Sequence, residues 1–212
     1  MYRLVVFDVD GVLFNIDSIW RYLHNFFGTW SMAKENMKLF FKGKLSYREW
    51  AELDAKLWKG FHLNKFYSAI EKIEVKGYAA ELVKYIKDKG LKTIAISAGL
   101  DLLKHRLEKE IGIDMFISNS IVFQNNICTG KVIVRVEYSN KDKVLKDFCL
   151  KENIPLHDVI TIGDSEVDIP MFKISGLSIA YNPKSLEVAI SSNITVFSED
   201  LKVLIEILER II

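Results

Sequence analysis

The sequence has little of what marks disulfide-rich, nucleic-acid-binding or membrane-spanning proteins. It has two cysteines, Cys128 and Cys149, which lie too far apart for a CxxC redox pair or a zinc cluster and make no disulfide framework. We therefore expect a reducing, cytoplasmic environment. The 29 Lys plus Arg residues balance the 28 Asp plus Glu residues, so we expect no nucleic-acid partner and no binding to an anionic membrane.

Long hydrophobic runs are missing as well. The first apolar run, residues 4–7, is interrupted at once by Asp8 and Asp10, so it cannot form the core of a signal peptide. No window reaches the ~20 consecutive apolar residues of a membrane-spanning helix. The chain also has neither a GxGxxG nor a GxxxxGK(S/T) motif, which excludes the usual dinucleotide and nucleoside-triphosphate loops.

Short apolar segments alternate with helical patterns along most of the chain. Buried strands are predicted by the β-branched runs at 4–7, 92–96 and 158–162. Helices are predicted at 78–89, 100–110, 141–152 and 199–211, the last opened by Ser198 as a cap. Shorter strands are predicted at 177–180 and 194–197, and an antiparallel hairpin at about 120–136. This order predicts an α/β fold with a mainly parallel sheet.

Residues 15–75 break that alternation. They show helical periodicity without a buried strand, and they contain all four tryptophans of the chain. We therefore expect an inserted helical subdomain over 15–75, with residues 1–14 and 76–212 forming the catalytic core.

Polar residues stand at the ends of three predicted strands. Asp8, Asp10 and Gly11 follow the first, Ser97 and Ala98 the second, and Asp164 and Asp168 the third. Ligands of open α/β sheets bind beyond the carboxyl ends of the strands. Crowded carboxylates there need a metal ion or raised pKa values, and hard oxygen ligands favour Mg²⁺.

Each of these residues also has a structural explanation when it is taken alone. Asp10-Gly11 is a turn signal, and Ser97 is a possible cap of a helix that begins near Gly99. Lys141, at the start of a predicted helix, is most simply a solvated surface charge. Their joint position at the strand ends favours a functional site.

Taken in order, Asp8-x-Asp10-Gly11, Ser97, Lys141 and Gly163-Asp164-x-x-x-Asp168 resemble the four motifs of the haloacid dehalogenase superfamily of phosphohydrolases. Within it, the chain looks most like the phosphoserine phosphatase branch. The resemblance covers essentially the whole chain. It implies a Rossmann-like core with a helical-bundle cap inserted after the first motif.

The resemblance also implies a role for each motif residue. Asp8 is the expected nucleophile, which forms an aspartyl phosphate, and Asp10 is the expected general acid and base. The expected Mg²⁺ ligands are the side chains of Asp8 and Asp164 and the backbone carbonyl of Asp10. Asp168 is expected to support these ligands.

Phosphate binding is assigned in the same way. The expected phosphate-binding residues are Ser97, Ala98, Lys141 and Gly11, and Lys143 is a weaker candidate for the lysine role. Because the second acid, Asp10, is absent from the dehalogenases of the superfamily, halide displacement is disfavoured.

The expected function is Mg²⁺-dependent hydrolysis of a small phosphomonoester, the one partner that the sequence predicts. Asp17 and Asp54 stand where phosphoserine phosphatases have the glutamate and arginine of the serine clamp, and Val167 and Ala98 stand where they have asparagine and glycine. We therefore expect a substrate other than phosphoserine. The alternatives are phosphoserine itself, a weakly catalytic phosphate-binding or regulatory protein, and transfer to an acceptor other than water. The sequence does not predict the oligomeric state.

Overall fold

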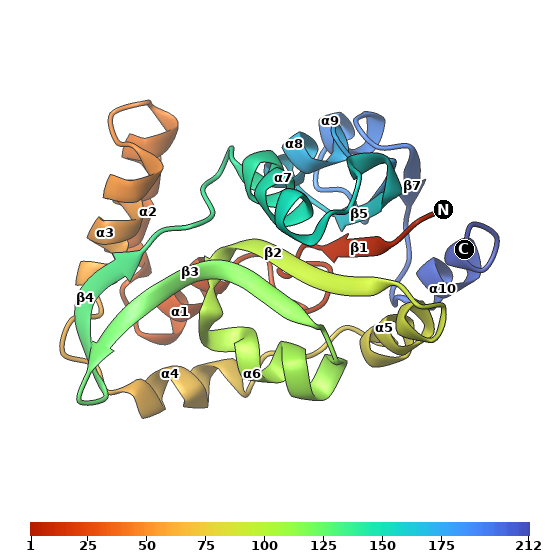
Figure 1. Ribbon diagram of the computed structural model, residues 1–212. Helices are drawn as coiled ribbons and strands as arrows, with labels where there is room; N and C mark the ends of the chain where they lie inside the picture. The colour runs from red at the N-terminus through yellow and green to blue at the C-terminus, as the bar shows by residue number, and fades with distance from the viewer.

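A seven-stranded sheet runs through the computed structural model, which describes residues 1–212 (Figure 1). The strand order is β4-β3-β2-β1-β5-β6-β7, and every neighbouring pair is parallel except β3 with β4. The strands are β1 (Leu4–Phe7), β2 (Lys92–Leu100), β3 (Met115–Gln124), β4 (Ile127–Ile133), β5 (Val159–Gly163), β6 (Leu177–Tyr181) and β7 (Ile194–Val196). The predicted α/β fold class and the antiparallel hairpin are confirmed.

Strand β1 lies at the centre of the sheet and sets the position of everything at its carboxyl end. Its residues are fully buried, as its continuous apolar sequence predicts. Its last residue, Phe7, pairs with Ala95 of β2 and Ile162 of β5. Because Phe7, Ala95 and Ile162 lie side by side, the residues that follow each of them in sequence come together at one edge of the sheet.

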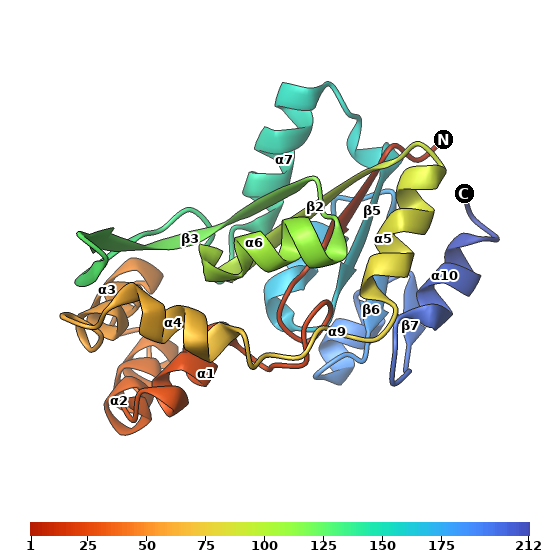
Figure 2. The same ribbon diagram turned by 90° about the horizontal axis from the view of Figure 1, so that it is seen from below.

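Helices cover both faces of the sheet (Figures 1 and 2). Alternate side chains of β1 serve the two faces: Val5 and Phe7 belong to one hydrophobic cluster, Leu4 and Val6 to the other. The first cluster includes side chains of α5 (Ala79–Asp88) and α10 (Lys202–Leu208) and of the turn after α6 (Lys104–Arg106). The second includes side chains of α7 (Lys141–Glu152), α8 (Ile169–Phe172) and α9 (Leu186–Ile190). None of the helices has both the length and the apolar composition needed to span a membrane.

Four further helices lie together beside the β3–β4 hairpin, at one end of the sheet (Figure 1). These cap helices are α1 (Ile19–Phe26), α2 (Trp30–Phe41), α3 (Tyr47–Lys56) and α4 (Leu63–Ile70). The hairpin is bonded to them, because the backbone N–H of Gly60 donates to the Cys128 carbonyl and that of Leu63 to Asn126. The cap helices fall within residues 15–75, whose status as a separate domain stays a prediction.

Two local predictions were wrong, and a third, the helix at 100–110, is confirmed only in part. Strand β2 does not end before Ser97 but continues to Leu100, because β3 still pairs with it there. Ser97 therefore caps no helix. The predicted helix at 100–110 is a 3₁₀ turn, a single α turn and a π turn, and α10 begins at Lys202 without a cap by Ser198.

Gly176, at the turn before β6, leaves no space for a side chain. A Cβ atom there would overlap the backbone carbonyl oxygen of His157, which cannot yield as a side chain can. We expect Gly176→Ala to lower the free energy of unfolding by about 1–3 kcal/mol in urea denaturation. The matched control is Gly77→Ala, whose Cβ would lie 3.2 Å from Asp200 Cβ, a contact that is tight but does not overlap. Equal stability of the two variants would contradict this account.

Candidate active site

The structure brings the predicted motif residues together at the carboxyl edge of β1, β2 and β5. Asp8 and Asp10 follow β1, Ser97 lies near the end of β2, and Asp164 follows β5. Gly11 has a positive φ of 86°, and a Cβ atom there would overlap Asp164, so glycine is required in this turn. The catalytic and ligand roles expected for these residues stay predictions, but their placement at one site follows from the strand register.

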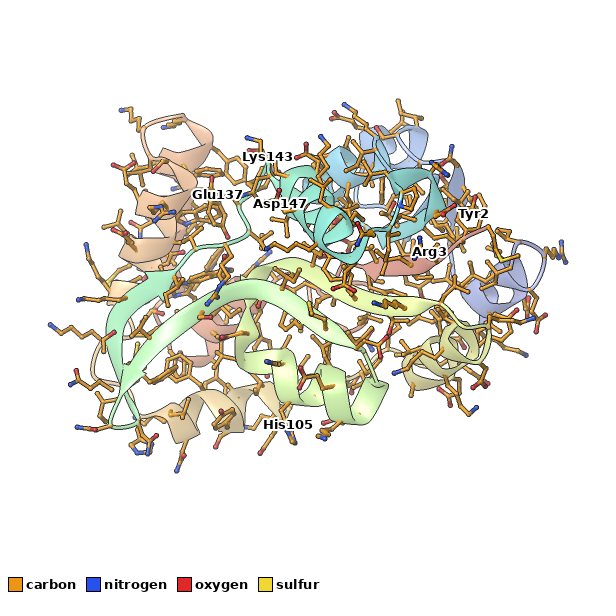
Figure 3. All side chains as sticks on the ribbon, viewed as in Figure 1. Tyr2, Arg3, His105, Glu137, Lys143 and Asp147 are labelled. Carbon is orange, nitrogen blue, oxygen red and sulfur yellow. The ribbon has the colours of Figure 1, made fainter.

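Lys141 is buried, so its interpretation as a solvated surface charge was wrong. It is the first residue of α7 and its side chain is 1% exposed. Its Nζ atom lies 2.6 Å from Asp8 Oδ1 and 2.6 Å from Asp168 Oδ1. Burial opposes its charge, but Asp168 and Asp8 together raise the pKa of Lys141 above its ordinary value. The alternative, Lys143, is exposed on α7 (Figure 3).

Asp168 holds the turn after β5 in place. While one of its oxygens accepts from Lys141, the other accepts from the backbone N–H groups of Asp164, at 2.9 Å, and Ser165, at 3.0 Å. The Ser165 hydroxyl is a further donor, at 3.2 Å. Because both oxygens are engaged, Asp168 supports the site rather than offering a free ligand atom.

Three buried carboxylates lie close together at this edge, and two of them, Asp8 and Asp164, are candidates to hold a metal ion directly. One oxygen each of Asp8, Asp164 and Asp168 lies within 4.8 Å of the others, and all three residues are buried. Asp164 Oδ1 is buried without a hydrogen-bond partner, and Oδ2 lies 2.9 Å from the ammonium of Lys184. An unpaired buried carboxylate oxygen beside two further carboxylates fits a hard cation. The sequence-based prediction of a metal site is supported to this extent.

Burial raises the pKa values of the site carboxyls. It raises the pKa of Asp8 to about 6, with repulsion from Asp168 adding to the effect and Lys141 opposing it. It raises the pKa of Asp10 and that of Asp164 to about 7, and in both cases the charge of Asp8 contributes. Neighbouring buried carboxyls with raised pKa values are typical of acid–base chemistry.

Asp10 connects the sheet edge to the first cap helix. Its Oδ2 accepts from the backbone N–H of Ile19, the first residue of α1, at 2.8 Å. Its Oδ1 is buried and has no partner. One oxygen is therefore fixed by the helix, while the other can exchange a proton with a bound ligand.

The carbonyl oxygen of Ala98 accepts three side-chain hydrogen bonds. Two donors come from cap helices: Trp20 Nε1 at 3.1 Å and the Tyr47 hydroxyl at 2.7 Å. The third is Asn119 Nδ2, at 2.9 Å from β3. These bonds fix the Ala98–Gly99 peptide, whose N–H donates to the Ser97 hydroxyl oxygen at 2.9 Å. The cap helices thus orient the backbone of the predicted phosphate-binding segment.

A pocket of about 660 Å³ opens from these residues into the cap helices. Asp8, Asp10, Ser97 and Lys141 line its floor, and Trp20, Trp30 and Trp50 are among the aromatic residues in its walls. The predicted clamp positions also line it. Asp17 is exposed, whereas Asp54 is buried and accepts from Asn36 Nδ2 at 2.8 Å.

Sequence reasoning missed three polar residues of the site. Lys184 follows β6 and contacts both Asp164 and, at 3.2 Å, the backbone carbonyl of Asp17. Its place after a predicted strand was a usable signal. Nothing in the local sequence pointed to Tyr47 or Trp20 as donors to Ala98, because that contact joins segments far apart in the chain.

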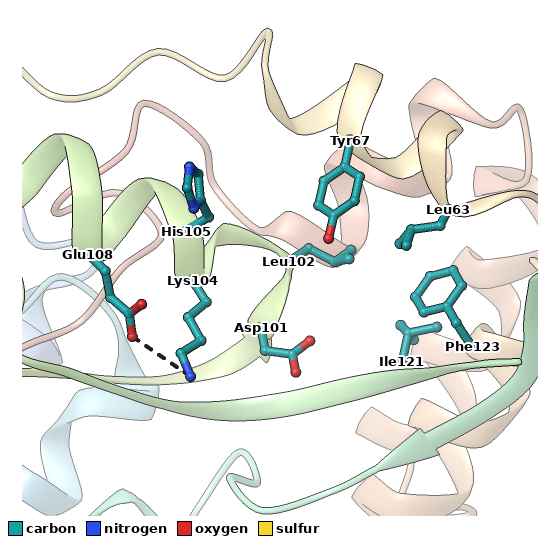
Figure 4. Close-up of a pocket in the computed structure, with 9 residues that line it drawn as sticks. All are labelled: Leu63, Tyr67, Asp101, Leu102, Lys104, His105, Glu108, Ile121 and Phe123. Carbon is teal, nitrogen blue, oxygen red and sulfur yellow. Dashed lines mark ion pairs between the residues drawn. The ribbon is translucent and has the colours of Figure 1, made fainter. Parts of the chain in front are cut away.

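A second pocket, of about 380 Å³, lies between α4, the start of α6 and β3 (Figure 4). Leu63 and Tyr67 come from α4, and Lys104 and Glu108 form an ion pair at 3.7 Å on its other side. It contains none of the predicted catalytic residues. It is separate from the site at the sheet edge.

Comparison with known proteins shows what this arrangement is similar to. The model of the haloacid dehalogenase-like hydrolases matches residues 5–173. A phosphoserine phosphatase of Methanocaldococcus jannaschii is 30% identical over 188 residues, covering 87% of this chain and 87% of that protein. One from Archaeoglobus fulgidus is 28% identical over 185 residues, or 87% of this chain, and the chain spans about half, 54%, of that protein's length. A solved phospho-aspartyl intermediate analogue of phosphoserine phosphatase has a TM-score of 0.81 at 28% identity, covering 99% of this chain and 98% of that one.

The raised pKa of Asp10 predicts how stability depends on pH in the absence of metal. The carboxyl titrates near 3.8 when unfolded and near 7 when folded, so its protonated form stabilises the fold. This stabilisation is complete below pH ~4 and is lost as the pH rises through ~7. In urea unfolding with a chelator, we expect Asp10→Asn to reduce the loss of stability between pH 5 and pH 8. The exposed control, Asp88→Asn, should keep the wild-type loss, and an unchanged loss in Asp10→Asn would contradict the prediction.

The bonds to Ala98 predict a role for Tyr47 in phosphate binding. Removing its hydroxyl in Tyr47→Phe frees the carbonyl from its shortest bond, and we expect about a tenfold weaker affinity for inorganic phosphate by titration calorimetry. Tyr22→Phe is the matched control, because the Tyr22 hydroxyl donates to a backbone carbonyl of Ala69, away from this segment. If both variants bind phosphate as the wild type does, the Ala98 bonds do not position the site.

Proposed function

The chain belongs to the haloacid dehalogenase-like hydrolase family and is a phosphoric monoester hydrolase, and we propose that it acts through a phosphoryl intermediate on Asp8 with Mg²⁺ as its metal ion. The family predicted from the four sequence motifs is thereby confirmed. The observation that best supports the proposed mechanism is the buried ammonium of Lys141 between Asp8 and Asp168. It neutralises part of an acidic site that would otherwise repel an anionic phosphate.

Asp8 is the group that attacks the phosphorus atom. The Lys141 ammonium donates to Asp8 Oδ1, and the backbone N–H of Asp8 donates to the Ile162 carbonyl at 2.8 Å. Asp8 is therefore held through both its side chain and its backbone. The Lys141 ammonium lowers the pKa of Asp8 against the effect of burial and so favours the ionised nucleophile. An oxygen of Asp8 forms a bond to phosphorus while the bond from phosphorus to the leaving oxygen breaks.

Asp10 donates a proton in the first step and accepts one in the second. Burial raises the pKa of Asp10 above its ordinary value, which favours the protonated form, and its Oδ1 is free to donate to the leaving oxygen. The resulting carboxylate then accepts a proton from the water that attacks the aspartyl phosphate. This second displacement releases inorganic phosphate and restores both carboxyls.

The metal ion would be held by Asp8, Asp164 and the backbone carbonyl of Asp10. It supplies positive charge that offsets the repulsion between the nucleophile and the phosphate oxygens. Asp168 positions the Asp164 turn and Lys141, and the Ser97 hydroxyl, the backbone around Ala98 and that around Gly11 bind phosphate oxygens.

The relatives make phosphoserine the first substrate to test. They support that alternative better than our prediction of a different phosphomonoester, for which the comparisons offer nothing. They also offer nothing in favour of a purely regulatory role. The cytoplasmic location and the lack of a nucleic-acid partner stay predictions.

Asp8→Asn tests the proposed mechanism. We expect phosphate release from p-nitrophenyl phosphate and from phosphoserine to fall at least about a thousandfold, because the amide is a poor nucleophile. Chelation of Mg²⁺ should abolish release by the wild type, and added Mg²⁺ should restore it. Asp88→Asn, an exposed substitution far from the site in sequence, is the control with unchanged turnover. Turnover of Asp8→Asn at the wild-type rate would rule out the proposed nucleophile.

A further inference from the structure

The pocket that opens from Asp8 extends well into the cap helices and has aromatic walls. Its volume of about 660 Å³ lies within the ~300–1,000 Å³ of pockets that bury drug-sized ligands. Its aromatic lining residues are Trp20, Trp30, Phe41, Tyr47, Trp50 and Tyr138. A space of this size next to the nucleophile accommodates a leaving group larger than that of phosphoserine.

The rings nearest the site are fixed in place. Trp20 and Tyr47 are bonded to the backbone of the phosphate-binding segment, and Trp20 also stacks on Trp58 with centroids 5.5 Å apart. Trp50 stacks on Phe40 at 4.6 Å. Rings that are already ordered lose little conformational freedom when a flat ligand packs on them, so they favour an aromatic ligand over a flexible one.

The charges of the cap wall do not suit a carboxylate-bearing leaving group. The buried charged residue there is Asp54, 4% exposed, with Asn36 as donor to one oxygen and His24 Nε2 at 3.4 Å from the other. The two cations of this wall, Arg21 and Lys34, are exposed. A carboxylate packed against these cap residues would therefore meet Asp54 and no buried lysine or arginine of the cap.

We propose, on the basis of the phosphatase function proposed above, that the preferred substrates are phosphomonoesters whose leaving group carries an aromatic or heteroaromatic ring and no carboxylate. The phosphate binds at Asp8 and Lys141, and the ring packs among Trp20, Tyr47 and Trp50. These three cap residues would therefore determine which leaving groups the enzyme accepts.

The direct test compares kcat/KM of the wild type for three esters of aliphatic alcohols in the presence of Mg²⁺. These are 2-phenylethyl phosphate, n-butyl phosphate and phosphoserine, with p-nitrophenyl phosphate as the general phosphatase control. We expect 2-phenylethyl phosphate to exceed each of the other two aliphatic esters at least about tenfold, since even one methylene in an apolar pocket changes kcat/KM by about that factor.

Substitutions in the cap test whether Trp50 is responsible for the preference for an aromatic leaving group. Trp50→Leu keeps an apolar side chain but removes the ring, and we expect the ratio between 2-phenylethyl and n-butyl phosphate to fall about tenfold, mainly through KM. Tyr67→Leu is the control, because Tyr67 is an exposed aromatic residue of a cap helix outside this pocket, and its ratio should match the wild type. If Trp50→Leu does not fold, Trp50→Phe, which keeps a ring but loses the N–H, should retain the ring preference.

The outcomes separate this inference from the proposed function. If p-nitrophenyl phosphate is hydrolysed but phosphoserine or n-butyl phosphate equals or exceeds 2-phenylethyl phosphate, the inference is overturned and the phosphatase function stands. If choline phosphate, assayed in parallel, exceeds all three, the pocket selects an organic cation and the aromatic class is wrong. If no ester releases phosphate, the proposed function fails and this inference fails with it.

Discussion

The active site depends on one buried ammonium group. Lys141 lies within 2.6 Å of both Asp8 and Asp168, and almost nothing of the three side chains is exposed. Removing one partner of such a network costs about 3–5 kcal/mol in general, because the remaining charges stay buried and unpaired. The position of Lys141 follows from α7 beginning at that residue beside the sheet edge. Asp168, held from one side by Lys141, in turn holds the turn that carries Asp164.

The cap helices do more than cover this site. The N–H that begins α1 donates to Asp10, and Trp20 and Tyr47 donate to Ala98, so the proton-transfer group and the phosphate-binding backbone both take their orientation from the cap. The same two aromatic side chains line the pocket for the leaving group. Binding of a leaving group and alignment of the reacting groups therefore involve the same side chains. This is how remote binding energy can be used in the reaction step.

The sequence predicted the elements whose signals are local. The continuous apolar run of β1 predicts a strand buried on both faces, and the order of the four motifs predicts the family. The predictions failed where contacts between distant parts of the chain determine the local structure or the burial of a residue. The strand through Ser97 extends because β3 continues to pair with it, and Lys141 is buried because two carboxylates more than 20 residues away in the chain receive it. The partners of Asp54, and Lys184 beside Asp164, also come from distant segments.

The central claim is that Asp8 carries the phosphoryl group during turnover. Rapid acid quenching of wild type turning over substrate with Mg²⁺, followed by borohydride reduction and peptide mass spectrometry, tests it directly, because an acyl phosphate is reduced to an alcohol and a free carboxylate is not. The account predicts a reduced side chain at Asp8, dependent on both substrate and Mg²⁺. Reduction at a different carboxyl, or none at Asp8 while phosphate is being released, would contradict it.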